Sequence, residues 1–394
     1  MLSRRSFFAF PGFLPFVDWP QWRGPNRDGS VALELPKAWP ERMRQVWNLP
    51  VGEGHASPVV VGNRVFQFSR VRDQETIAAY DVDSGKQLWK QSYAAPYEMN
   101  SAATSHGKGP KSTPVVAGSR VFTLGISGIV TGWDAASGKK LWSTAAKGSP
   151  DFGHASSPVV DGDTLIGAVG PQSGGTLSAF EAATGKVKWQ WKEDGPAYAS
   201  PIVIMAGGVK QVVTNSQSHL IGVSLADGKT LWKLPLKTNY DQNSVTPLVV
   251  GDVVIFSGLG NPVTAVRPGS QPQKLWENKE FGMYMNSPVL AAGVVWGLSH
   301  RNKGQFFGID PKTGKTVWTS EGRQTENAAM VASGNAVFAL TTESELIVYA
   351  ASAKGLTQVR RYHVADTPTW AHPVVLGNRV LVKDANSLIL WSAA

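Results

Sequence analysis

The chain of 394 residues contains no cysteine. Without a thiol it can form no disulfide bond, no thiolate zinc site and no cysteine nucleophile. The same absence excludes a lipid anchor on an N-terminal cysteine. The stability of the protein, and any chemistry that it performs, must therefore come from packing and from other side chains.

Long apolar runs and basic clusters are missing as well. No stretch reaches the roughly 18 consecutive apolar residues of a membrane-spanning helix, so we expect no such helix. The formal net charge is +9, but lysine and arginine are scattered along the chain without a run of five or more. A nucleic-acid interface gathers such residues on one face, so we predict none. The excess positive charge is still compatible with a small anionic ligand.

The motifs of common active sites do not occur. The sequence has no HExxH pair, no calcium-loop pattern, no G-x-S-x-G nucleophile elbow and no glycine-rich phosphate loop. Its seven histidines do not form a local cluster. From the residues alone we therefore assign no catalytic residue and no metal ligand.

The N-terminal residues have the character of an export signal. Arg4 and Arg5 precede an apolar stretch at residues 7–17, which is the order of a twin-arginine signal. A frayed basic terminus on a cytosolic protein is the alternative. We expect residues 1–17 to be an export signal, so that the mature protein works in the periplasm or is otherwise exported. Residues 18–43 are then expected to form an N-terminal arm.

What the sequence has in abundance is one repeated phrase. A small polar residue and a proline are followed by β-branched residues, a glycine turn and a second apolar stretch, first at residues 57–66. Copies start at positions 58, 114, 158, 201, 247, 288, 330 and 373, and the copy at 330 lacks the proline. Eight units with a period of about 43 residues predict a repeat architecture.

A second phrase places a tryptophan four residues after a glycine near the end of most units. The pairs are Gly85/Trp89, Gly138/Trp142, Gly185/Trp189, Gly228/Trp232 and Gly314/Trp318. Glycine adopts the left-handed backbone of a tight hairpin without strain. The tryptophan then falls in the next strand, where a large flat ring can fill the space between two sheets.

Each unit holds about four short segments rich in Val, Ile, Phe and Thr, and none shows a helical period. One four-stranded sheet cannot bury both of its faces, but sheets stacked around an axis bury each other. We therefore predict an all-β fold, an eight-bladed β-propeller of four-stranded antiparallel blades, in a single domain of residues 44–394. Residues 44–49 are expected to complete the last blade and close the ring.

The phrase at residues 79–89, repeated at 308–318, resembles the propeller repeat of the pyrroloquinoline-quinone (PQQ) family. The resemblance extends over residues 44–391, and residues 18–29 are similar to the leader of exported bacterial PQQ-like repeat proteins. It implies the fold of quinoprotein alcohol dehydrogenases. Two branches differ in function. The dehydrogenases oxidise alcohols or sugars with PQQ and calcium, whereas BamB-like proteins of the outer-membrane barrel assembly machinery work through contacts, without a cofactor.

The resemblance favours a binding scaffold over an enzyme. The dehydrogenases are longer, many carry adjacent cysteines beside the quinone, and they hold calcium with Glu, Asn and Asp side chains that we cannot place here. We expect a ligand- or protein-binding scaffold without a cofactor. The alternative is a small dehydrogenase that uses PQQ and calcium on an alcohol or sugar. BamB-like proteins are usually lipoproteins, so a cysteine-free chain fits a soluble periplasmic protein of the same architecture.

A binding site is expected at one mouth of the central channel, where the innermost strands and the loops between blades converge. The candidate residues precede an innermost strand or follow the second strand of a blade: His55, Lys111, His154, Asn243, Asn286, His300, Arg301, His372 and Lys383. They would offer a basic, hydrogen-bonding surface to a small anionic ligand or to an unknown protein or peptide. The alternative is that they cap turns or pair with the backbone of the next blade. We expect the protein to be a monomer.

The first two units are separated by 56 residues instead of about 43, and the surplus lies at residues 94–111. A long loop on a rigid scaffold is often functional. The insertion could form a lid over the mouth or a partner-binding arm, and a tolerated surface insertion is the alternative.

Overall fold

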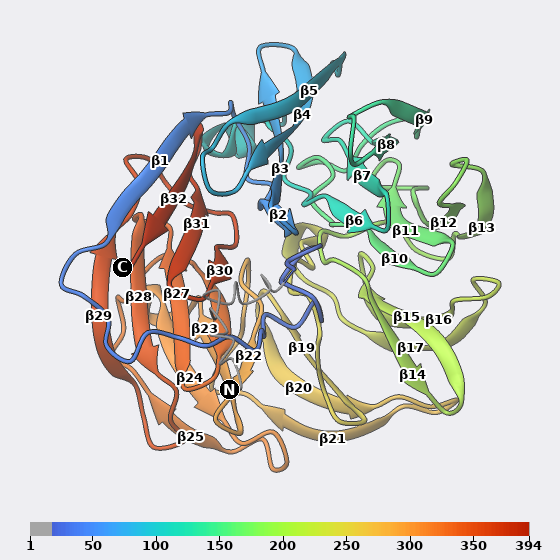
Figure 1. Ribbon diagram of the computed structural model, residues 1–394. Coiled ribbons are helices and arrows are strands. Elements are labelled where there is room, and N and C mark those ends of the chain that lie inside the picture. Colours follow the sequence, from blue (N-terminus) through green and yellow to red (C-terminus); the bar gives the residue numbers. More distant parts are fainter. Residues whose placement is uncertain (1–17, 394) are drawn as a thin grey trace, which may run out of the picture.

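Eight four-stranded antiparallel sheets stand around a central axis and form the predicted eight-bladed propeller (Figure 1). The computed structural model describes residues 18–393, so the predicted export signal, residues 1–17, lies outside the described residues. No helix within the described residues is long and apolar enough to cross a membrane. The helices that the structure describes are three short 3-10 turns: η1 (Ser101–His106), η2 (Asn239–Asp241) and η3 (Arg301–Lys303).

Seven blades are formed by strands that follow one another in the sequence, from the innermost strand outwards. The strands of blades 1 to 4 are, in order, β2 (Val59–Val61), β3 (Arg64–Val71), β4 (Gln74–Asp81) and β5 (Gln87–Ala94); β6 (Val115–Ala117), β7 (Arg120–Leu124), β8 (Ile129–Asp134) and β9 (Lys140–Ala145); β10 (Val159–Asp161), β11 (Thr164–Val169), β12 (Thr176–Glu181) and β13 (Val187–Trp191); β14 (Ile202–Ala206), β15 (Val209–Asn215), β16 (His219–Ser224) and β17 (Thr230–Pro235). Those of blades 5 to 7 are β18 (Leu248–Val250), β19 (Val253–Gly258), β20 (Asn261–Arg267) and β21 (Gln273–Asn278); β22 (Val289–Ala291), β23 (Val294–Ser299), β24 (Gln305–Ile309) and β25 (Thr316–Thr319); β26 (Ala328–Ser333), β27 (Ala336–Thr341), β28 (Glu345–Ala350) and β29 (Thr357–His363).

Blade 8 joins the two ends of the described chain. Its three inner strands are β30 (Val374–Leu376), β31 (Arg379–Lys383) and β32 (Ser387–Ser392), and its outermost strand is β1 (Arg44–Pro50). Strand β1 pairs antiparallel with β32. The ring is therefore closed by hydrogen bonds between the first strand and the last, as the sequence predicted.

The apolar core lies between adjacent blades rather than within one sheet. One buried cluster joins blades 1 and 2 through Phe66 and Trp133. Another joins blades 6 and 7 through Phe306 and Ile347. Each blade therefore depends on its neighbours for the burial of its faces, as expected for a repeat that cannot fold alone.

The repeated glycine and tryptophan hold neighbouring blades together. The indole Nε1 of Trp89 in blade 1 donates to the backbone oxygen of Ala135 in blade 2 at 3.1 Å. The same ring lies against Gly138 of blade 2, where an added Cβ would come within 2.5 Å of the indole. Because Gly138 also has a φ of +73°, both backbone geometry and the neighbouring ring require glycine there. The equivalent pairs between other blades are Trp47/Gly85, Trp142/Gly185, Trp189/Gly228 and Trp276/Gly314.

The residue before the proline of the repeated phrase links each blade to the next. Six blades have a serine or threonine there, which we name the hydroxyl ring: Ser57, Thr113, Ser157, Ser200, Thr246 and Ser287. The backbone N–H of Ser57 donates to Oγ1 of Thr113 at 3.1 Å, and the same bond repeats along the ring. The N–H of His372 in blade 8 returns to Ser57 Oγ at 2.8 Å. Blade 7 has Ala329 at this position, so the ring is interrupted there.

Candidate functional site

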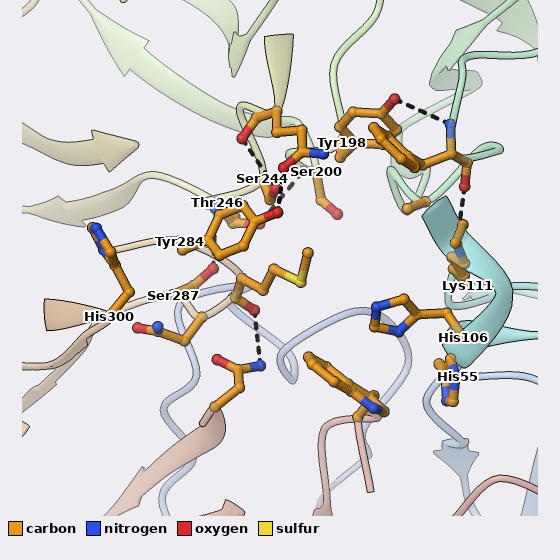
Figure 2. A pocket seen from close by; sticks show the side chains of 18 of the residues that line it. His55, His106, Lys111, Tyr198, Ser200, Ser244, Thr246, Tyr284, Ser287 and His300 are labelled. Atoms are coloured by element: carbon orange, nitrogen blue, oxygen red, sulfur yellow. Dashed lines mark hydrogen bonds between the residues drawn. The ribbon is translucent and has the colours of Figure 1, made fainter. Parts of the chain in front are cut away.

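The central channel opens into a pocket at one end of the propeller (Figure 2). Its volume of about 400 Å³ lies within the range of small-molecule sites. In every blade the third residue before the start of the repeated phrase lines this pocket, and we name these residues the mouth ring: His55, Lys111, Ala155, Tyr198, Ser244, Met285, Asn327 and Trp370. The scaffold repeats eight times, yet no two members of the mouth ring are alike.

One side of the pocket is aromatic and basic. The insertion at residues 94–111 contributes η1, and His106 in this turn lies edge-on to Trp370, with ring centroids 4.7 Å apart. His55 lies 6.0 Å from His106. Burial, assisted by the nearby charge of Lys383, lowers the pKa of His55 to about 3, so this ring is neutral at neutral pH. The insertion therefore builds one wall of the pocket.

Lys111 supplies the cation on this side. Its Nζ donates to the backbone oxygen of Phe152 at 2.9 Å. Burial lowers the pKa of Lys111 to about 8. Because a pKa of about 8 still lies above neutral pH, the ammonium is mostly charged, and its remaining N–H groups can serve an anionic ligand.

The opposite side of the pocket is neutral and polar (Figure 2). Ser200, Thr246 and Ser287 of the hydroxyl ring line it. Each of their oxygens already accepts a backbone N–H from the preceding blade. The hydroxyl hydrogens are the groups that remain for a ligand, so this side favours acceptors such as carboxylate or carbonyl oxygens.

Four of the nine predicted site residues line the pocket: His55, Lys111, Asn286 and His300. Arg301 lies next to His300 in η3, and its guanidinium donates to the backbone oxygens of Lys279 and Glu280. The other four are buried outside the pocket lining: His154, Asn243, His372 and Lys383. The structure thus brings only part of the predicted set together.

His154 and Asn243 are engaged by the scaffold. Nδ1 of His154 donates to the backbone oxygen of Ile126 at 3.0 Å, and the N–H of Gly170 donates to Nε2 at 3.1 Å. Burial lowers the pKa of His154 to about 4, so the ring stays neutral. The amide of Asn243 donates to three backbone oxygens. Both side chains hold loops in place, which is the alternative role that the sequence allowed.

His372 and Lys383 lie deeper than the pocket wall. His372 is edge-on to Trp22, with ring centroids 4.5 Å apart. Lys383 is fully buried, and its Nζ donates to the backbone oxygens of Gly54 and Asp384 at 3.0 and 2.6 Å. Burial lowers the pKa of Lys383 to about 7. Lys383 therefore supports the segment that carries His55.

The sequence prediction missed several groups that line the pocket, among them Trp22, Thr246 and Tyr284. The constant offset of three residues before each repeated phrase was the signal that could have found the mouth ring. Trp22 has no such signal, because the N-terminal arm lies outside the repeat and its path depends on tertiary contacts.

The residues of the pocket do not fit a calcium and PQQ centre. Calcium is held by six to eight oxygen ligands, usually including several carboxylates. Glu326 is the one carboxylate in the pocket lining. Within residues 18–393 no group of three or more His, Cys, Asp or Glu side chains is arranged to hold a metal ion. We therefore derive no step through this cofactor.

Comparison with known proteins finds solved structures with the same fold and identifies a protein family. The BamB protein of Yersinia pestis, an outer membrane protein assembly factor, is 25% identical over 295 residues, which is 70% of this chain and 70% of that protein. The structure of BamB from Moraxella catarrhalis has a TM-score of 0.66 at 14% identity and covers 89% of this chain and 97% of its own. A quinohemoprotein alcohol dehydrogenase from Comamonas testosteroni shares the fold, with a TM-score of 0.69, 14% identity and coverage of 96% and 80%.

The family model described as outer membrane protein assembly factor BamB matches residues 73–320, which is more than half of the chain. The protein therefore belongs to the BamB family of PQQ-like repeat propellers.

Proposed function

We propose that the protein is a scaffold without catalysis of its own, which binds another protein at the mouth of the pocket. Its relatives are named outer membrane protein assembly factors, and we extend a protein-binding role of this kind to this chain. The predicted export signal supports a place in the periplasm or elsewhere outside the cytosol. We expect the scaffold to act as a monomer.

The observation that carries the proposal is an exposed apolar rim beside the pocket. Tyr240 in η2 is 79% exposed, and Met285 of the mouth ring is 39% exposed. Tyr240 and Asp241 both have left-handed backbones, with φ of 61° and 53°, and such backbones are costly for residues other than glycine. Tyr240 lies on this strained loop, two residues before Gln242 of the pocket lining, and Met285 lies in the lining itself. Exposed apolar side chains beside a pocket are typical of an interaction surface.

The pocket itself would hold an anionic group. Lys111 offers a charged ammonium on one side, and the hydroxyl ring offers hydrogens on the other. The mouth ring contains no carboxylate, and Glu326 is the one carboxylate elsewhere in the pocket lining. A carboxylate on the partner protein, or a small anionic ligand, has the matching chemistry.

Site-specific photo-crosslinking tests the protein-binding role. A photoreactive amino acid replaces Tyr240 or Met285. The control position is Met205, which is 63% exposed and lies near the end of β14 that is farther from the mouth of the pocket. The probe is an outer-membrane β-barrel protein diluted from urea, and an unfolded soluble protein of similar size serves for comparison. We expect adducts with the barrel protein at positions 240 and 285 but not at 205. Equal adducts at all three positions, or none, would refute the proposed function.

A titration with PQQ and Ca²⁺ tests the alternative enzyme. We expect no saturable change in tryptophan fluorescence, and no dye reduction when an alcohol and sugar panel is added with an artificial electron acceptor. Saturable binding together with turnover would replace the scaffold by a dehydrogenase.

A further inference from the structure

The N-terminal arm does not lie on the outside of the propeller. After residue 18 it enters the region near the axis, and it later crosses one face to reach β1 (Figure 1). Trp19 and Ser30 form isolated bridges with the innermost strands of blade 1 and blade 7. These innermost strands surround the channel. The arm therefore lies inside the channel, on the side of the pocket that is opposite its mouth.

Backbone hydrogen bonds attach the arm to three blades. Trp19 and Val60 of β2 exchange both N–H···O bonds, at 2.7 and 2.9 Å. The N–H of Val116 in β6 donates to the backbone oxygen of Pro20 at 2.8 Å. Residues 29–31 add to β26 through two bonds with Ala332, at 2.8 and 3.0 Å. In blades 1 and 7 the arm thus pairs with the innermost strand, as an additional strand nearer to the axis would.

Two arginines attach the arm to two further blades. The guanidinium of Arg27 donates to the backbone oxygens of Ser157 and Pro158 in blade 3, at 2.9 and 3.0 Å. Arg23 donates to the backbone oxygen of Pro288 in blade 6. Both side chains are buried, and burial lowers the pKa of Arg23 to about 10 and that of Arg27 to about 9. They remain charged at neutral pH, and the planar guanidinium of Arg27 bonds to two carbonyl groups of the repeated phrase, whereas that of Arg23 bonds to one.

Trp22 attaches the arm to two further blades and reaches the pocket. Its indole Nε1 donates to Thr246 Oγ1 in blade 5 at 3.1 Å, and its ring lies edge-on to His372 of blade 8. Trp22 is also part of the pocket lining. The arm is therefore fixed to blades 1, 2, 3, 5, 6, 7 and 8, and its indole forms the inner end of the pocket.

The arm also spans the place where the hydroxyl ring is interrupted. Blade 7 has Ala329 instead of a hydroxyl residue. Around this gap the arm bonds to Pro288 in blade 6, to Ala332 in blade 7 and, through Trp22, contacts His372 in blade 8. Contacts from the arm thus link blade 7 to blades 6 and 8, across the two steps at which the hydroxyl ring is interrupted.

We propose that residues 18–31 are a plug that closes the channel, so that the pocket is blind and its ligand enters and leaves by a single mouth. The plug is a separate unit that docks onto the completed ring, and Trp22 is the part of it that meets the ligand. The proposal does not depend on the partner of the scaffold, because the state of the plug can be measured without any ligand.

Thiol labelling of the full chain tests the plug. The natural chain has no cysteine, so single reporters have no background. Ala332→Cys and Ala339→Cys both place a thiol in the buried cluster between blades 6 and 7, but only the backbone of Ala332 is hydrogen-bonded to the plug. Both parent positions are buried, so we expect both thiols to react slowly with a maleimide in the otherwise native chain.

Two matched variants separate opening of the plug from unfolding of the ring. Trp19→Ala removes a fully buried indole from the plug, and Trp191→Ala removes a buried indole from blade 3. We expect Trp19→Ala to speed labelling of the thiol at position 332 by at least about a hundredfold and to leave position 339 unchanged. Trp191→Ala should not speed position 332 more than position 339.

Arg27→Lys provides a milder test if Trp19→Ala fails to fold. It keeps the charge but cannot bond to both carbonyl groups of blade 3, so we expect labelling at position 332 to rise about tenfold. Fast labelling at position 332 in the native chain would show that the channel is open and would overturn the proposal. If labelling of both thiols became faster by the same factor in every variant, the arm would not be a separate unit, and this result would also overturn the proposal.

Discussion

Alanine at Gly138 should destabilise the protein more than alanine at Gly118, although both glycines lie in hairpins of blade 2. Gly118 has a φ of +57°, and nothing lies within 4 Å of an added Cβ. Gly138 has a φ of +73°, and its added Cβ would lie 2.5 Å from the ring of Trp89. The left-handed backbone costs alanine about 1–2 kcal/mol, and overpacking adds about 1–3 kcal/mol. We therefore expect about 1–2 kcal/mol for Gly118→Ala and about 2–5 kcal/mol for Gly138→Ala.

Urea unfolding followed by circular dichroism and by tryptophan fluorescence measures both changes, and agreement of the two probes shows that a single transition is compared. The background variant Trp89→Ala isolates the contact between blades. Without the indole, Gly138→Ala should cost no more than Gly118→Ala, because only the backbone strain remains. Equal costs in the native background, or an unchanged cost of Gly138→Ala in the Trp89→Ala background, would refute our account of the repeated glycine and tryptophan.

Three further predictions concern the hydroxyl ring, a buried lysine and the export signal. Ser157→Ala removes the acceptor of a buried N–H and should cost about 1–3 kcal/mol in urea unfolding, whereas the exposed Ser84→Ala should cost far less. Burial lowers the pKa of Lys383 from 10.5 to about 7, so between these values the unfolded chain binds the extra proton and stability rises with pH. Lys383→Met should flatten this rise in unfolding curves from pH 7 to 10, and an unchanged slope would contradict the assignment. Replacing Arg4 and Arg5 by lysine should keep the protein in the cytosol on cell fractionation, and unchanged export would speak against a twin-arginine signal.

The repeat made the architecture predictable, because its period, its turn glycines and its β-branched runs all point to four-stranded blades. The closing strand β1 could be predicted for the same reason, since the last unit lacked one strand and residues 44–49 supplied it. The site was predictable only in part. His55, His154 and His372 all precede an innermost strand, but they stand three, four and one residues before the start of the phrase. These offsets decide which way a side chain points, and the prediction treated them alike.

The path of the N-terminal arm could not be predicted, for another physical reason. Its residues follow no repeat, and one hydrogen-bond partner of Arg23 is Pro288 in blade 6, more than 260 residues away in the sequence. Such a contact exists only when the ring has brought distant blades together. The arginines of the arm look like part of a scattered basic excess in the sequence, whereas in the structure they bond to backbone oxygens near the axis.

The arrangement of the pocket follows from the position of each residue relative to the repeated phrase. In six blades the residue one before the phrase has a hydroxyl oxygen that accepts a backbone N–H of a neighbouring blade. The residue three before the phrase lines the pocket in all eight blades. The first set therefore fixes the scaffold and the second is free to vary in chemistry. A change such as Lys111→Gln should alter binding of an anionic group while urea unfolding stays nearly the same, because the Lys111 side chain makes a single hydrogen bond to the described part of the scaffold, to the backbone oxygen of Phe152.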